Sequence, residues 1–338
     1  MKEGDTVNSR INVMADRVAE NRDVLKQIVR MEPDRMLLAG AAVLASRGIR
    51  ADRSALEGCR DILKENTGAL SEYRGMIRVP LLCMMAASGT PEYYLRCVQE
   101  IEELIRSTPK IRRVSKVYRI LAAMTVQEHS SEMTASETVE RILALYEDMK
   151  TEHPWLTGEE DLPFAALMAA SGKDTQALTD DAEACYSILR NYFKSGNVRQ
   201  TVSQVLSLSG EEPEDKCLRA ADLADDLKRL GCRIGTDLES VILGSAALTG
   251  VPADRMAEDI AYADECLKQK KGFGSLSLGT QTRRMFAGLL AICSADPGIG
   301  GAAVSTAVAV QTAIEIQMQV CMMLMMNSSM AAATAATT

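Results

Sequence analysis

Aromatic residues are scarce in this chain: they form 4% of its 338 residues and include four Phe and a single Trp. Sheets are usually rich in aromatic and β-branched side chains. A core built from Leu, Ala, Val and 19 Met is typical of packed helices instead. Few aromatics also leave little for bases to stack on, and a net charge of -8 opposes generic nucleic-acid binding. We therefore expect an all-helical protein that binds no nucleic acid.

Metal-binding and disulfide patterns are also missing. The chain has two His, and its nine Cys stand singly with no Cys-x-x-Cys pair, which excludes a zinc ribbon or a thioredoxin-like motif. An odd number of scattered Cys indicates a reducing compartment. The first residues have no apolar run of the kind found in a signal peptide. These features predict a cytoplasmic protein with no cofactor.

A recurrent tripeptide is the strongest positive feature. Apolar runs end in Ala-Ser-Gly, Ala-Ser-Gly, Leu-Ser-Gly and Leu-Thr-Gly at Gly89, Gly172, Gly210 and Gly250, with a weaker copy at Gly48. Successive copies lie 41, 83, 38 and 40 residues apart. Recurrence at this spacing predicts structural units of about 40 residues that are stable only when stacked on one another.

Each unit is predicted to be a pair of helices. In one copy, residues 79–87 form an apolar helix, Gly89 ends it, and Thr90-Pro91 begins a second helix. Residues 114–126 and 284–293 are degenerate first helices without the glycine. The prediction is therefore an all-α stack of about seven antiparallel helix pairs, an α-solenoid or HEAT- or TPR-like superhelix. Its curvature stays open between an extended solenoid and a compact arc.

The expected organisation is a single helical repeat domain over 1–338. It divides into an N-terminal capping helix (1–31), helix pairs (32–297), an apolar C-terminal helix (298–330) and a flexible tail (331–338). The C-terminal helix carries a polar stripe of Gln311, Glu315 and Gln319, which favours packing against the last helix pairs over a membrane span. Its methionines could form either ordinary core or an adaptable partner groove.

The chain resembles a bacterial family known as domain of unknown function four thousand and three. The residues that carry the resemblance are Gly68 to Gly75, His153 to Thr157 running into Asp161-Leu162-Pro163, and the Gln-containing C-terminal helix. The resemblance extends over nearly the whole chain. It implies a helical fold and a bacterial cytosolic setting, and it implies no reaction, because no activity is assigned to the family.

The segment 152–161 is the best candidate for a functional site. It holds His153, the single Trp155, and three adjacent carboxylates, Glu159, Glu160 and Asp161. An imidazole beside carboxylates could ligate a metal or move a proton. The alternative is structural: Thr157 and Glu160 would form a capping box for the next helix, with Trp155 filling the gap between units. The structural alternative is favoured, and His153, Glu159, Glu160 and Asp161 remain weak metal candidates.

Three further segments carry charge or glycine. A basic stretch could bind an anion, although pairing with acids of the next unit is favoured; it comprises Arg106, Lys110, Arg112, Arg113, Lys116 and Arg119. Asp222, Asp225 and Asp226 resemble magnesium-binding carboxylates, but a solvated helix face explains them better. The glycine-rich segment 272–279 has no P-loop or dinucleotide fingerprint, so a linker is expected.

No motif specifies a reaction, so no catalytic residue is assigned. The favoured function is a non-enzymatic scaffold that binds another protein or a peptide. A low-ranked partner surface comprises Trp155, Arg112, Arg113, Lys116 and Arg119. The alternative is a small-ligand or metal-binding protein, or an enzyme, centred on His153 and Glu159–Asp161. Anion or RNA binding at residues 106–119 is a minor third hypothesis. Nucleic acid and a membrane are not expected as partners.

Overall fold

The computed structural model describes residues 3–129, 133–234, 238–275 and 277–295, and these residues form fourteen α-helices and no strand. The all-α prediction is therefore confirmed for the described part of the chain. The predicted apolar C-terminal helix (298–330) and tail (331–338) lie outside the described residues. No described helix is long and apolar enough to cross a membrane.

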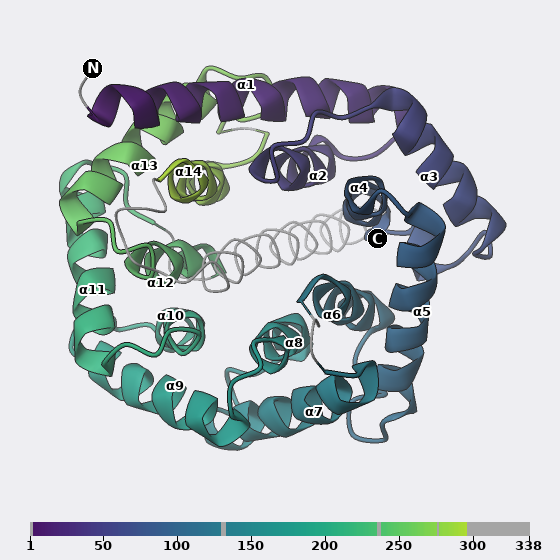
Figure 1. Cartoon of the computed structure of the whole chain (residues 1–338). Helices are drawn as coiled ribbons and strands as arrows, with labels where there is room; N and C mark the ends of the chain where they lie inside the picture. The colour runs from purple at the N-terminus through teal and green to yellow at the C-terminus, as the bar shows by residue number, and fades with distance from the viewer. Residues whose placement is uncertain (1–2, 130–132, 235–237, 276, 296–338) are drawn as a thin grey trace, which may run out of the picture.

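The helices alternate between an outer and an inner layer (Figure 1). The outer layer comprises α1 (Glu3–Ile28), α3 (Arg53–Glu65), α5 (Pro91–Ser107), α7 (Ala135–Glu152), α9 (Thr175–Leu189), α11 (Pro213–Arg229) and α13 (Ala253–Lys268). The inner layer comprises α2 (Asp34–Ser46), α4 (Arg78–Ser88), α6 (Lys116–His129), α8 (Leu162–Ala170), α10 (Gly196–Leu206), α12 (Val241–Ala247) and α14 (Thr280–Ser294). Short 3-10 turns η1 (Glu72–Arg74), η2 (Glu159–Asp161) and η3 (Leu238–Ser240) precede α4, α8 and α12.

The two layers close into a ring. Helix α1 packs against α13 and α14 as well as against its sequence neighbour α2, and α14 also contacts α2 (Figure 1). The first helix is thus the element that joins the two ends of the array, whereas the sequence assigned it to a cap. These contacts differ from those of an open HEAT- or TPR-like superhelix, in which the first and last helices stay apart.

Local sequence explains which helices lie inside. All ten residues from Met36 to Ala45 in α2 are buried, as are all ten from Val117 to Val126 in α6. Such helices need neighbours on every side. An outer helix such as α3 buries one stripe, Leu56, Cys59 and Leu63, and exposes its other faces to water. Inner helices are therefore buried on every side and mostly apolar, although α10 also buries Gln200, Thr201, Ser203 and Gln204.

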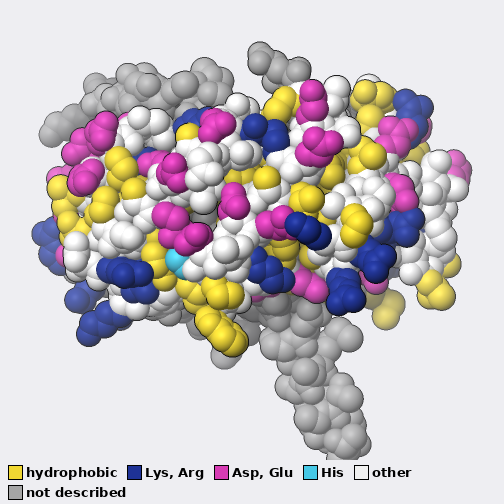
Figure 2. Space-filling view, turned by 90° about the horizontal axis from the view of Figure 1, so that it is seen from below, with side chains coloured by type: hydrophobic (Ala, Val, Ile, Leu, Met, Phe, Trp, Pro, Cys, Tyr) yellow, Lys and Arg dark blue, Asp and Glu magenta, His cyan; other side chains and the backbone are white. Residues whose placement is uncertain are grey.

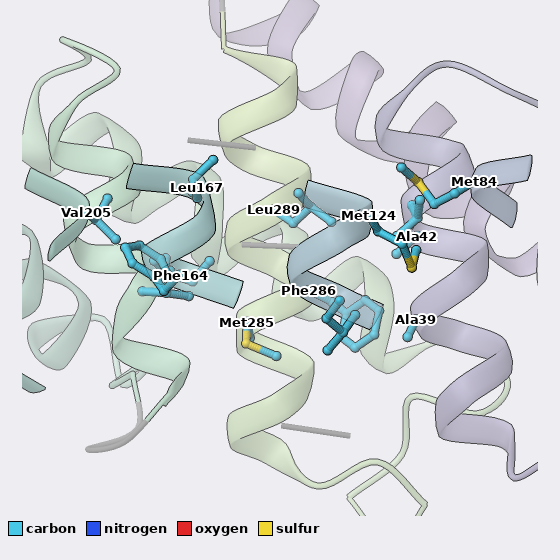
Figure 3. Packing of buried hydrophobic residues seen from close by; sticks show 14 of the residues in the cluster. Ala39, Ala42, Met84, Met124, Phe164, Leu167, Val205, Met285, Phe286 and Leu289 are labelled. Atoms are coloured by element: carbon cyan, nitrogen blue, oxygen red, sulfur yellow. The ribbon is translucent and has the colours of Figure 1, made fainter. Parts of the chain in front are cut away.

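Small residues let the inner helices approach one another. A Cβ atom added to Gly288 of α14 would lie 2.5 Å from Cγ2 of Ile242 in α12, and one added to Gly40 of α2 would lie 2.7 Å from Cγ1 of Val79 in α4. Figure 3 shows part of the resulting core, where Phe164 of α8, Val205 of α10, Phe286 of α14 and Ala39 of α2 are among the buried side chains that the inner helices contribute. Close approach on the inside, with longer helices outside, gives the curvature that closes the ring.

The Ser/Thr-Gly tripeptides form the turns that lead from an inner helix to the next outer helix. Gly89 adopts a φ of +70° after α4, and its backbone N–H bonds to Ala86 O. The preceding hydroxyl bridges the turn: Ser88 Oγ donates to Met85 O at 2.8 Å and accepts from Thr90 N at 3.2 Å. Ser171 and Thr249 do the same at their own turns. We call the side of the ring that carries these turns the turn face.

Positive φ recurs at Gly48, Gly172 and Gly250, which follow α2, α8 and α12. Gly210 follows α10 without a positive φ. The predicted glycines thus lie at corresponding places in the topology, although Gly210 closes its helix by another geometry.

Cations from neighbouring units cap the inner helices on the turn face. Helices α8, α10 and α12 have no basic residue in their own last turn. Arg141 donates to Ala169 O of α8 at 3.2 Å, Lys173 Nζ to Leu208 O beyond α10 at 2.7 Å, and Arg219 to Ala247 O of α12 at 2.9 Å. Each positive charge faces the negative end of a helix dipole and ties one helix pair to the next.

The connections from outer to inner helices, most of which are longer, lie on the opposite side, which we call the loop face. They comprise residues 29–33, 66–77, 108–115, 153–161, 190–195, 230–240 and 269–279. Contacts join neighbouring loops. Glu32 accepts from Arg78 at the start of α4, Lys116 Nζ lies 5.0 Å from the Tyr73 ring, and Ser115 N donates to Glu159 at 2.9 Å. These contacts connect successive loops from 29–33 to 153–161 along one rim.

Candidate functional site: a tryptophan between two basic loops

The loop 153–161 begins where α7 ends and is held by its own polar groups. Thr157 Oγ1 donates to Met149 O of α7 at 2.9 Å and accepts from Gln200 Nε2 of α10 at 3.2 Å. Gly158 N donates to Asp161 Oδ2 at 2.8 Å. The expected capping box of Thr157 with Glu160 is therefore wrong, because Thr157 caps the preceding helix and Asp161 closes the turn.

His153 fastens this loop to α9. Its Nε2 lies 2.8 Å from Oε1 of Glu183, and its ring lies against Tyr186 with the ring centroids 4.1 Å apart. Arg199 covers the Tyr186 ring, 4.9 Å from its centroid, and donates to its hydroxyl at 3.2 Å. The imidazole thus has a structural partner, Glu183 of α9, which lies outside the predicted segment 152–161.

The weak metal candidates do not converge. Glu159 accepts the hydrogen bond from Ser115 N, while Asp161 turns inward to Gly158 N and His153 pairs with Glu183. No group of three His, Cys, Asp or Glu in the described residues has an arrangement that could hold a metal ion. The geometry of the described residues therefore offers the metal hypothesis no ligand set.

Asp161 is the most perturbed acid of the loop. It is 9% exposed. Burial raises the pKa of its carboxyl from the ordinary 3.8 to about 7, and the charge of Glu160 adds to the rise, while the hydrogen bond from Gly158 N opposes it. The tip of this loop therefore carries less negative charge near neutral pH than its sequence indicates.

Trp155 projects into solvent with 96% of its surface exposed. The expectation that it fills the gap between helix pairs is wrong. The adjacent Leu156 packs inward instead, where a Cβ atom added to Gly196 of α10 would lie 3.1 Å from its Cδ1. Of these two apolar side chains, Leu156 packs inward and Trp155 makes no internal contact.

Two basic loops flank Trp155. The bond from Ser115 to Glu159 joins loop 108–115 to it, and the contact of Leu156 with Gly196 places loop 190–195 on its other side. Neither flanking loop contains an acidic residue. We call residues 108–115, 153–161 and 190–195 the Trp155 sector. Figure 2, seen from the side of α7 and α9, shows hydrophobic side chains projecting between Lys and Arg groups along the lower rim.

The described structure divides the predicted partner surface. Arg112 and Arg113 are exposed and form no ion pair within the described residues. Arg119 is only 7% exposed: its Nε donates to Glu102 at 2.8 Å, and its guanidinium also binds Val114 O. Lys116 is half-buried beside the same Glu102 and the Tyr73 ring. Arg119 thus forms an internal ion pair with Glu102 and does not belong to a surface. Without Glu102 its guanidinium would be costly to bury.

The other basic residues of the stretch also find acids. Arg106 pairs with Glu103 on its own helix, and Lys110 Nζ lies 2.7 Å from Glu147 of α7. The sequence favoured pairing of these basic residues with acids of the next helix pair, and the ion pair of Lys110 with Glu147 agrees with that prediction.

Sequence reasoning missed two exposed apolar residues on the loop face. Met31, in loop 29–33, has a relative exposure of 102% and a φ of +68°, the only positive φ at a non-glycine among the described residues. Leu70, in loop 66–77, has a relative exposure of 100%. The available signal was position, since each stands in a connection from an outer to an inner helix. Tyr192 and Leu230 are about half exposed in two further connections.

The remaining charged and glycine-rich segments give less evidence of a functional site. Asp222, Asp225 and Asp226 line an open groove of about 820 Å³ between α11 and α13, together with Arg229, which pairs with Asp226. In segment 272–279 Phe273 is buried, and its carbonyl accepts from Arg283 at 3.4 Å. Asp222 and Asp225 lie on a solvated helix face as the sequence favoured, whereas Asp226 is buried, and segment 272–279 is a linker that packs through Phe273.

Comparison with known proteins agrees with the resemblance noted from the sequence. The model of a family described as "Protein of unknown function (DUF4003)" matches residues 21–321. The "Uncharacterized protein YeaA" of Bacillus subtilis (strain 168) is 29% identical over 199 residues, which cover 58% of this chain and 59% of that protein. The aligned part thus spans less than two thirds of the relative's length. No solved structure matches.

Proposed function

The chain belongs to the DUF4003 family of proteins of unknown function, and from this premise we propose that it is a non-enzymatic interaction scaffold that docks through its loop face. The expected partner, another protein or a peptide, belongs to the same proposal. The described residues form a ring with a large internal core, and no group of three His, Cys, Asp or Glu among them is placed to hold a metal ion.

The observation that carries the proposal is the full exposure of three large apolar side chains, Met31, Leu70 and Trp155, on loops of one face. Burying such a side chain is worth about 1.5–3 kcal/mol. The fold leaves this free energy unused at three loops of one rim. The other exposed large apolar residues that the structure describes, of which Tyr93 is the most exposed at 54%, keep about half or more of their surface covered. The three side chains stand on separate loops of the same face, so a partner that covers this face would bury all three.

The alternative proposal, a ligand or metal site or an enzyme around His153 and Glu159–Asp161, has weaker support. The polar groups of this loop have partners within the described chain: Glu183 for His153, Ser115 N for Glu159 and Gly158 N for Asp161. A ligand would have to displace one of them.

A cysteine-protection experiment tests the scaffold without assuming a partner. Single variants Trp155→Cys and Leu70→Cys would report on the loop face, and Tyr93→Cys on the turn face, where Tyr93 is a half-exposed aromatic just after the Gly89 turn. Alkylation of each position is followed by peptide mass spectrometry in purified protein and in whole cell extract. We expect slower alkylation in extract at positions 155 and 70 and no change at 93. Equal alkylation rates in both samples at all three positions would refute loop-face docking.

A further inference from the structure

We propose that the partner of the loop face is the surface of an anionic phospholipid bilayer. Trp155, Leu70 and Met31 would enter the headgroup region, and the exposed Lys and Arg of the neighbouring loops would face lipid phosphates. This inference rests on the docking through the loop face in the proposed function, and it replaces the protein or peptide partner of that proposal with a lipid surface.

Charge on the loop face is complementary to an anionic surface. Three of the seven loops, 108–115, 190–195 and 269–279, contain Lys or Arg and no acid. Arg112, Arg113 and Lys194 are exposed and form no ion pair among the described residues. Loop 153–161 keeps the charges of Glu159 and Glu160, but the two loops beside it carry five basic residues: Lys110, Arg112, Arg113, Arg190 and Lys194. A basic residue close to an anionic bilayer contributes about 1 kcal/mol.

The overall charge of -8 does not cancel this attraction. Charges are screened over about 8 Å at physiological ionic strength. Helix α1 alone has 26 residues and is therefore about 39 Å long. Acids on the turn face, such as Glu92, Glu137 and Asp254 in the first turns of outer helices, lie well beyond that range from a bilayer beneath the loop face. The basic charge on the loop face therefore makes its electrostatic interaction with an anionic bilayer attractive.

The apolar residues suit a bilayer better than a folded partner or RNA. Trp is favoured at the membrane–water interface, and Leu and Met can enter a headgroup layer without a preformed pocket. Each stands alone on a separate loop, so a protein partner would need a matching pocket at each point. RNA would gain stacking from Trp155 but nothing from two aliphatic side chains. The sequence argument against a membrane concerns a spanning helix, which contact with the bilayer surface does not need.

Backbone geometry at Met31 adds an independent observation. Its φ of +68° is a conformation that glycine adopts freely and other residues adopt at a cost. Met at this position lowers stability and is fully exposed. A strained position that holds an exposed apolar residue indicates a role outside the fold.

The single Trp of the chain makes the test direct, because intrinsic tryptophan fluorescence reports on position 155 alone. Purified full-length protein is mixed with vesicles of phosphatidylglycerol and phosphatidylcholine in equal parts, or with pure phosphatidylcholine vesicles. We expect co-sedimentation with the anionic vesicles only, a blue shift of Trp155 emission, and loss of both at high salt.

Variants locate the contact. We expect Arg112→Gln with Arg113→Gln to weaken vesicle binding about thirtyfold, since two charges are removed. Leu70→Ser should weaken binding by about tenfold or more, the free energy of one buried leucine. The matched control Arg53→Gln with Arg96→Gln removes the same charge from exposed positions in the N-terminal parts of α3 and α5 and should leave binding unchanged. Circular dichroism confirms that each variant is folded.

Three outcomes overturn the proposal: no binding to anionic vesicles, binding that leaves Trp155 emission unchanged, or a larger emission shift with polyuridylate than with vesicles. The lipid proposal and the scaffold proposal fail separately. If positions 155 and 70 are protected in extract cleared of membranes while vesicles do not bind, the scaffold stands and the bilayer does not. If neither protection nor binding occurs, both fail.

Discussion

Replacing Asp161 with Asn should stabilise the protein at neutral pH and leave its stability unchanged at acid pH, in each case compared with the parent chain. Asp161 is buried at the end of the Trp155 loop, and burial raises the pKa of its carboxyl to about 7. In the unfolded chain the same carboxyl has its ordinary pKa of 3.8. Between these two values the unfolded chain is ionised while the folded chain still holds the proton.

The sign and size follow from proton linkage. The folded state binds the proton more tightly, so this carboxyl favours folding most at low pH, and its contribution declines by about 1.4 kcal/mol for each pH unit from about pH 4 to about pH 7. The full difference between a pKa of 3.8 and one of about 7 corresponds to about 4 kcal/mol. Asn is uncharged at every pH, and its Oδ1 can still accept the hydrogen bond from Gly158 N. We therefore expect Asp161→Asn to match the parent near pH 4 and to exceed it by about 4 kcal/mol above pH 7.

Urea unfolding followed by far-ultraviolet circular dichroism, at several pH values between about 4 and 8, measures this difference. The control is Glu152→Gln, which removes an exposed carboxylate at the end of α7 and should change stability by less than about 0.5 kcal/mol at any pH. A constant gap between Asp161→Asn and the parent across the pH range, or a less stable variant at neutral pH, would show that the buried carboxyl is stabilised as an anion and that our reasoning is wrong.

Three further substitutions test the fold and its exposed loop. Met31→Gly relieves the positive φ, so we expect a gain of about 1 kcal/mol in the urea unfolding free energy together with weaker binding to anionic vesicles; a loss of stability would contradict the strain. Gly288→Ala places a Cβ atom 2.5 Å from Ile242, so unfolding should become easier by about 1–3 kcal/mol, and an unchanged urea midpoint would mean that the inner helices are less tightly packed. Lys173→Met removes the ammonium that caps Leu208 O and should cost about 1–3 kcal/mol in thermal or urea unfolding, whereas an exposed lysine changed to Met on the loop face should cost little.

Much of the helical organisation could be predicted because its signals are local. The Ser/Thr-Gly pattern ends α4, α8 and α12 at Gly89, Gly172 and Gly250, and each hydroxyl bonds only to backbone groups two or three residues away. Such turns depend on a few neighbouring residues, so a single sequence displays them. Gly210 shows the limit, because the same letters there end α10 without the left-handed conformation.

The candidate site was less predictable. Trp155 and Leu156 are adjacent and both apolar, yet one is exposed and the other packs on Gly196. Arg113 and Arg119 belong to one basic stretch, yet only the first faces water. The difference for Arg119 is Glu102, an acid on the preceding helix that comes within 2.8 Å only after α5 and α6 have packed. Whether a side chain is exposed depends on the residues that pack around it, and those residues come from other helices and loops.

By itself, the sequence determined that the described chain is helical, where most inner helices end, and that no described segment carries a recognisable catalytic motif. Only the tertiary structure decided that the array closes into a ring and that its long loops gather on one rim. Helix ends depend on hydrogen bonds within one turn, which the local sequence specifies. Closure depends on small packing angles summed over all the helices, until α1 meets α13 and α14 some 250 residues further along the chain, and no local pattern records that sum.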